Sequence, residues 1–200
     1  RLIGLLRRVS GQTDIWVMDS TRGVLRRVTS DARDDGNPVW SPDSARVAFS
    51  SNPRGIRDLY QISVSGGGTE EALLESAENK NPWDWSPDGR FILYANISPN
   101  TAWDLWVLPL EGDRKPFAIA QTRYDESQGR FSPDRRWVAY TSNETGRDEV
   151  YVRPFPGPGP SVQVSINGGT DAQWRRDTRE LFYLEPGLRL MAVPIIVSKD

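Results

Sequence analysis

The chain has 200 residues, 25 of them Lys or Arg and 27 Asp or Glu, so its formal net charge is −2. It contains no cysteine and no histidine, which excludes disulfide scaffolds, cysteine-based metal sites, a Ser-His-Asp triad and most catalytic zinc sites. The near-neutral charge gives no general attraction to nucleic acid, and no run of about 20 apolar residues could span a bilayer. We therefore expect no nucleic-acid partner, no membrane insertion by this segment, no metal and no cofactor.

Short β-strands are predicted along the whole chain, because β-branched and aromatic residues alternate with polar ones between turn residues. The first unit contains three predicted strands, Arg1–Val9, Asp14–Asp19 and Val24–Thr29. The second contains four, Asn37–Ser41, Arg46–Ser50, Asp58–Val64 and Glu71–Glu75. The third and fourth units follow the second, and the last contains three strands. In order, the units cover residues 1–30, 36–76, 81–121, 126–166 and 171–195.

Two motifs repeat in phase with these units. Trp40-Ser41-Pro42-Asp43 recurs three times, beginning at Trp85, Phe131 and, in divergent form, Trp174. Asp-Ile-Trp at 14–16 likewise recurs at 58–60, 104–106 and 149–151. Four antiparallel strands repeating every 40–45 residues or so are typical of a β-propeller blade. We predict an all-β fold, an arc of four-stranded antiparallel blades whose first and last units are incomplete. Since the sequence begins with Arg1 rather than Met, we expect a longer parent chain.

The repeated residues resemble the TolB-like propeller, a relative of the WD repeat, over essentially the whole chain. More narrowly, residues 104–117, 129–134, 149–157 and 180–184 resemble the C-terminal propeller of bacterial eukaryotic-type Ser/Thr protein kinases, frequent in acidobacteria. That resemblance implies a cytosolic kinase, a membrane span and a propeller that senses or binds a ligand, periplasmic or otherwise extracytoplasmic. The absence of cysteine fits a reducing cytosol as well as a periplasmic domain without disulfides. None of the motifs needed for phosphoryl transfer is in this chain, so we expect a non-catalytic module.

The repeated motifs themselves are interpreted as structural. Ser-Pro-Asp is a turn that every blade requires, and Asp14, Asp58, Asp104 and Glu149 are expected to accept hydrogen bonds from turn amides or a neighbouring Arg. Most of the tryptophans are assigned to blade packing. Trp83 and Trp103 lie where the other repeats have no aromatic residue, so either packing or a stacking platform for a ligand fits them.

Polar positions that differ between repeats are the candidate ligand site. The inner strand of each blade borders the central channel, and residues two apart share a face of a strand. We predict a polar channel mouth built from Asn37, Asp84, Gln128, Arg130, Asp171 and Gln173, rimmed by Asp35, Lys80 and Glu126. A hydrogen-bond network between blades fits the same residues. The acidic stretches that hold Asp35 and Glu126 are interpreted as solvated loops.

Three functions remain open from the sequence. The first is a ligand- or protein-binding propeller that serves as the sensor domain of a Ser/Thr kinase, with a protein, a peptide or a small polar molecule as its partner. The second is the gating propeller of a prolyl-oligopeptidase-type serine peptidase. The third is a free-standing periplasmic TolB-like scaffold. Unpaired strand edges in the incomplete blades also predict self-association.

Overall fold

The computed structural model describes residues 1–30, 33–65, 67–99 and 101–196. Within these ranges the chain forms 18 strands in five antiparallel sheets and contains no helix. The first sheet has three strands, β1 (Leu2–Val9), β2 (Gln12–Asp19) and β3 (Val24–Arg27). The second has four, β4 (Gly36–Trp40), β5 (Arg46–Ser51), β6 (Asp58–Ser63) and β7 (Glu71–Leu74).

The remaining sheets continue the same order of strands. The third contains β8 (Asn79–Trp85), β9 (Phe91–Ser98), β10 (Ala102–Pro109) and β11 (Phe117–Ala120). The fourth contains β12 (Glu126–Phe131), β13 (Trp137–Ser142), β14 (Glu149–Pro154) and β15 (Val162–Gln163). The fifth has three strands, β16 (Thr170–Trp174), β17 (Glu180–Glu185) and β18 (Arg189–Pro194). The predicted fold class is confirmed, including the shorter first and last sheets.

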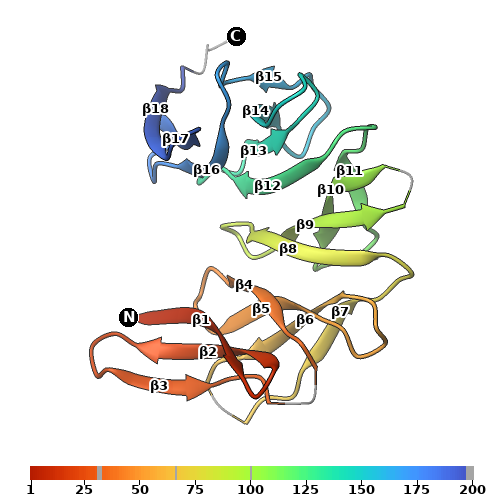
Figure 1. Cartoon of the computed structure of the whole chain (residues 1–200), viewed down its shortest axis with the longest axis vertical. Coiled ribbons are helices and arrows are strands. Elements are labelled where there is room, and N and C mark those ends of the chain that lie inside the picture. Colours follow the sequence, from red (N-terminus) through yellow and green to blue (C-terminus); the bar gives the residue numbers. More distant parts are fainter. Residues whose placement is uncertain (31–32, 66, 100, 197–200) are drawn as a thin grey trace.

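The five sheets follow one another along an open arc (Figure 1). Strands β4, β8, β12 and β16 lie on its concave side, whereas the outer strands β7, β11 and β15 lie on the convex side. In the second to fifth sheets, neighbouring strands are consecutive in the chain, so each of these sheets runs outward from its first strand. The concave side therefore presents the first strand of four successive sheets.

Apolar clusters between neighbouring sheets hold the arc together. Between the first two sheets, Ile15 and Val17 pack against Val47, Phe49 and Tyr60. Similar clusters occupy the next three junctions and include Ile92, Leu105, Phe131 and Leu181. Every second residue of a strand faces the same neighbour, so each inner sheet buries both of its faces. Burial of this kind contributes about 25 cal/mol per Å² of apolar surface.

The repeated Ser-Pro-Asp motif forms the turn between the first and second strands. The hydroxyl of Ser86 donates to the carboxylate of Asp88 at 2.6 Å and accepts from the amide of Phe91 at 2.9 Å. Ser132 and Asp134 repeat the side-chain bond at 2.6 Å. Each bond satisfies groups of the turn itself, and these contacts confirm the structural interpretation of the motif.

Candidate functional site

The inner strands carry a bulge that sets the direction of their polar side chains. Asn37 in β4, Gln128 in β12 and Asp171 in β16 occupy equivalent positions and have positive φ angles of 51°, 54° and 54°. The pairing register of each strand shifts at this point. The equivalent residue in β8 is Pro82, whose ring holds φ near −65°, and there the register shifts between Pro82 and Asp84. Asn and Asp tolerate the left-handed region better than most residues.

The side chains at the bulge bond from sheet to sheet along the concave side. The amide nitrogen of Asn37 donates to the side-chain oxygen of Asn81 in the next sheet at 3.0 Å. Gln128 donates to the carboxylate of Asp171 at 3.1 Å, and its carbonyl oxygen accepts from the backbone amide of Asp171 at 3.0 Å. Asn37 and Gln128 are half-buried, whereas Asp171 is exposed. We refer to Asn37, Asn81, Gln128 and Asp171 as the concave row.

Asp84 and Arg130 meet at the junction between β8 and β12. The two carboxylate oxygens of Asp84 accept from the amides of Trp85 at 2.9 Å and Phe131 at 2.8 Å. Arg130 donates to the carbonyl oxygen of Trp83. Burial raises the pKa of Asp84 to about 6, although the Arg130 charge and the two amide hydrogen bonds favour the ionised form. Asp84 and Arg130 therefore each bond a backbone group across the junction between the third and fourth sheets.

Gln173 lies apart from the other five predicted residues. It pairs with Phe182, whose neighbours Leu181 and Tyr183 pack against the fourth sheet. Because side chains alternate along a strand, Gln173 and Phe182 lie on the face of the fifth sheet that points away from the fourth sheet, at the end of the arc. Gln173 is exposed there. The structure thus divides the six residues into the concave row, the Asp84–Arg130 junction and this end face.

The three residues expected to rim the channel mouth are buried. Asp35, Lys80 and Glu126 are each 1% exposed, so they are neither an accessible rim nor part of solvated loops. The reason is that each enters its inner strand beneath the preceding sheet, next to a buried carboxylate of that sheet. Lys80, for example, bonds the carboxylate of Asp58 at 2.9 Å.

The acidic residue that begins each copy of the Asp-Ile-Trp motif accepts hydrogen bonds, as the sequence predicted. Asp14 is bonded by Arg27 at 2.7 Å. Asp58 accepts from the guanidinium of Arg54 at 2.6 Å and from the amide of Ser76 at 3.0 Å. Their structural role is confirmed by these contacts.

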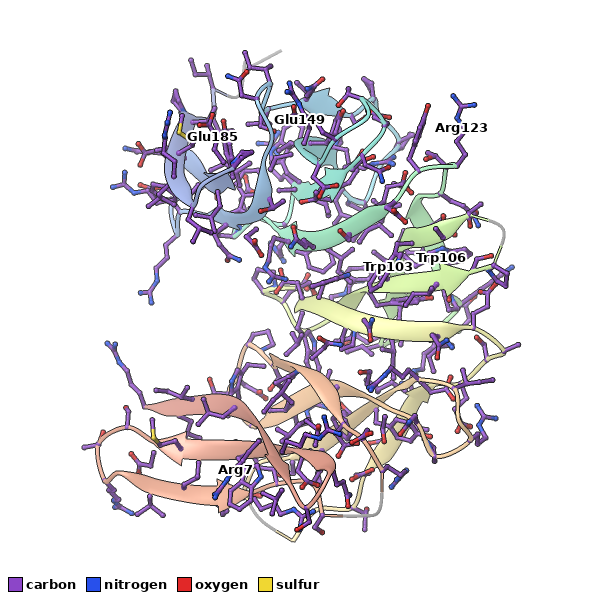
Figure 2. The ribbon with its side chains drawn as sticks, in the orientation of Figure 1. Arg7, Trp103, Trp106, Arg123, Glu149 and Glu185 are labelled. Atoms are coloured by element: carbon purple, nitrogen blue, oxygen red, sulfur yellow. The ribbon has the colours of Figure 1, made fainter. Side chains whose placement is uncertain are left out.

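Trp83 and Trp103 contact each other, with ring centroids 6.5 Å apart and ring planes tilted by 41°. Both are half-buried, and Trp83 packs against the apolar cluster between the third and fourth sheets. Figure 2 shows Trp103 close to the ribbon of the third sheet, while Arg123 projects away from it. This arrangement matches the packing interpretation of the two tryptophans.

Two concavities lie near the fourth and fifth sheets. An apolar groove of about 560 Å³ is lined by Trp137, Val152, Val162, Val193 and Ile195, and none of the six predicted residues lines it. A second pocket, of about 340 Å³, is lined by Asp171 together with Arg147, Asp148, Glu185 and residues 168–170, 184 and 186–188. Asp171 thus connects the concave row to a pocket that carries three carboxylates and one guanidinium.

The sequence did not single out Asn81, which completes the concave row. The one feature of the sequence that could have indicated Asn81 is that it precedes Pro82. Proline cannot adopt the positive φ that the other inner strands have at this position. Among the described residues, no group of three or more Asp or Glu side chains is placed to hold a metal ion. In the same residues, no helix is long and apolar enough to cross a membrane.

Five successive antiparallel sheets, wound from inner to outer strand and joined by repeated Ser-Pro-Asp turns, define a β-propeller of the TolB-like class. Residues 2–103 match the family described as the TolB beta propeller domain. The chain belongs to this family.

Individual relatives agree with this assignment. The uncharacterized protein Atu1656 of Agrobacterium fabrum is 26% identical over 164 residues, which cover 70% of this chain and 53% of the relative. Tricorn protease homolog 1 of Streptomyces coelicolor is 27% identical over 112 residues, covering 54% of this chain and 10% of that protein. The crystal structure of TolB from Acinetobacter baumannii superposes with a TM-score of 0.77 at 18% identity, covering 96% of this chain and 49% of TolB. The chain therefore spans about half the length of the Agrobacterium and Acinetobacter proteins.

Proposed function

We propose that the chain is a non-catalytic binding module whose ligand, a protein segment or a small polar molecule, contacts the concave row at its Asp171 end. The observation that carries this proposal is the position of Asp171. It is exposed, is hydrogen-bonded to Gln128 across the junction between the fourth and fifth sheets, and also lines a pocket with Asp148 and Glu185. The excess of carboxylates in this pocket favours a ligand with a cationic group, such as a Lys or Arg side chain or an amino terminus.

A selection from a random-peptide phage library, followed by fluorescence anisotropy with the best synthetic peptide, tests the site. Replacing Asp171 by Ala is expected to weaken binding about tenfold, the loss of one charge-assisted hydrogen bond. Asp113→Ala is the matched control, because Asp113 is an exposed carboxylate between β10 and β11 and lines neither concavity. Equal affinity of both variants for the selected peptide would place the ligand elsewhere.

We further propose that the chain is the extracytoplasmic sensor domain of a bacterial Ser/Thr protein kinase. The support is the resemblance of residues 104–117, 129–134 and 149–157 to the propellers of such kinases. The TolB-like fold agrees with a periplasmic position. The coding sequence on either side tests this assignment, because a kinase must precede the propeller, and an upstream region without one would remove the support.

A second candidate is the propeller of a serine peptidase. It is favoured by the relatives described as tricorn protease homologues, one of which is 39% identical over 70 residues. This function requires a peptidase domain in the same parent chain. A downstream α/β-hydrolase segment with a Gly-x-Ser-x-Gly motif would therefore replace the kinase assignment.

A further inference from the structure

Each junction between neighbouring sheets contains one buried carboxylate at an equivalent position. These carboxylates belong to Asp14, Asp58, Asp104 and Glu149, and none is more than 1% exposed. The residue that enters the next sheet beside each of them differs from junction to junction, and in order these residues are Asp35, Lys80, Glu126 and Gly169. The four junctions therefore share one backbone arrangement but differ in the charge that stands beside the buried carboxylate.

At the second and fourth junctions, the buried carboxylate is paired with a cation, and the residue that enters the next sheet carries no carboxyl group. Asp58 bonds the ammonium of Lys80 at 2.9 Å, and both side chains are buried. Glu149 bonds the guanidinium of Arg147 at 2.7 Å and accepts from the hydroxyl of Ser165 and, at 3.0 Å, the amide of Gly168. In these two places the carboxylate has a cation and further donors.

The first junction instead brings two carboxyl groups together. One oxygen of Asp14 accepts from Arg27, but its other oxygen and both oxygens of Asp35 lack a hydrogen bond of ordinary geometry in the described residues. The hydroxyls of Thr29 and Ser51 and the charge of Arg33 act on Asp35. Glu70 adds a third carboxylate nearby and is bonded to Arg33 at 2.7 Å.

The third junction repeats this arrangement with Asp104 and Glu126. Asp104 accepts from the hydroxyl of Thr101 at 2.6 Å through one oxygen, while its other oxygen is buried without a hydrogen bond within the described residues. Glu126 accepts from the hydroxyl of Thr122. The other titratable groups that act on this pair are Glu78, Glu144 and Tyr140, none of which is cationic.

Two ionised carboxylates in a buried site repel each other and lose their hydration, so one negative charge must be compensated. Lys80 marks where a positive charge fits at the second junction. We propose that the first and third junctions each take up a proton, on Asp35 beside Asp14 and on the Asp104–Glu126 pair, so that mild acidification stabilises the packed sheets. A proton needs only the two carboxyl groups that each junction supplies.

The direction of the pH effect follows from these environments. Burial raises the pKa of Asp35, Asp104 and Glu126, and a neighbouring carboxylate raises each of them further. A raised pKa means that the folded state binds the proton more tightly than the unfolded state, so stability increases as the pH falls through the raised value. The gain ends near the ordinary values of 3.8 for Asp and 4.5 for Glu. Asp58 and Glu149 have lowered pKa values and lose stability on further acidification.

Urea unfolding at about pH 7.5 and about pH 5 tests the proposal. The experiment uses an Asp84→Asn background, because Asp84 also titrates in this range. We expect a higher unfolding midpoint at the lower pH, and we expect Asp35→Asn combined with Glu126→Gln to reduce this rise, to which Glu70 and Asp104 still contribute. Asp43→Asn is the matched control, because Asp43 is an exposed turn residue with a lowered pKa, and it must leave the rise intact.

A second variant and a direct measurement keep the test decisive if the combined variant unfolds. Asp35→Lys should reproduce the Lys80 arrangement and raise the midpoint at about pH 7.5. Carboxyl ¹³C NMR of the otherwise unaltered chain should show Asp35 and Glu126 titrating above 4.5, the ordinary value for Glu. Ordinary titration of both groups, or a pH-dependent rise that is as large in the combined variant as in the Asp84→Asn background, would overturn the proposal. So would stabilisation by Ca²⁺ at about pH 7.5 that the combined variant loses, because a metal ion would then supply the compensating charge.

Discussion

Asp84 at the β8–β12 junction provides a quantitative test of the electrostatics of the concave side. Its pKa is raised by burial from the ordinary 3.8 to about 6. At 1.36 kcal/mol per pH unit, that difference corresponds to about 3 kcal/mol against the ionised form in the folded state. The stability of the chain should therefore increase by up to this amount as the pH falls from about 7.5 to about 4.

The Asp84→Asn variant should lack the increase in unfolding free energy that protonation of Asp84 contributes as the pH falls. Asparagine has one carbonyl oxygen, so it keeps an acceptor for one of the two amides, of Trp85 and Phe131, and loses the other. The lost hydrogen bond costs about 1 kcal/mol, and Arg130 loses its neighbouring charge. At about pH 7.5 these losses offset only part of the gain from removing a buried charge, so the variant should be more stable than the unaltered chain by up to about 2 kcal/mol.

Urea unfolding of both chains between about pH 7.5 and about pH 4.5 measures the effect. The difference in unfolding free energy between the two chains should change by about 2–3 kcal/mol across this range, in favour of the unaltered chain at low pH. Taking the difference removes the contributions of the other carboxyl groups. A constant difference across the range would show that Asp84 titrates normally and refute the reasoning.

Three further changes follow from the packing. Lys80→Met leaves the buried carboxylate of Asp58 with Arg54 alone as its cation and should lower the unfolding free energy by about 3 kcal/mol in urea titrations; an unchanged midpoint would contradict this. Gly129→Ala places a methyl group 2.5 Å from the side chain of Leu93 and should cost about 1–3 kcal/mol by the same measurement, whereas Gly157, with open space around it, is the control position. The edge of β1 opposite β2 and the edge of β18 opposite β17 pair with no strand in the described residues. Concentration-dependent association is therefore expected in sedimentation velocity, and a single monomeric species at high concentration would argue against it.

The repeat alone was enough to predict the class of fold. The spacing of Trp40, Trp85, Phe131 and Trp174 fixes where each blade begins, and Ser-Pro-Asp fixes the turn that follows. These are local properties, since turn conformation and strand alternation depend on residues close together in the chain. For the same reason, the sequence was sufficient to assign Ser86 and Asp88 to a turn and to predict three strands in the first and last sheets.

Tertiary structure decided how the polar residues of the inner strands are used. Asn37 and Gln128 turn towards the next sheet because the bulge gives them a positive φ, and no short-range pattern specifies that conformation for glutamine. Asp35, Lys80 and Glu126 resemble solvated loop residues in the sequence, yet each is buried beneath a hairpin about 20 residues earlier in the chain. Whether such a charge is exposed, paired or neutralised by a proton depends on which side chain the preceding sheet places beside it. That neighbour is set by packing between sheets, which the spacing of residues within one repeat does not specify.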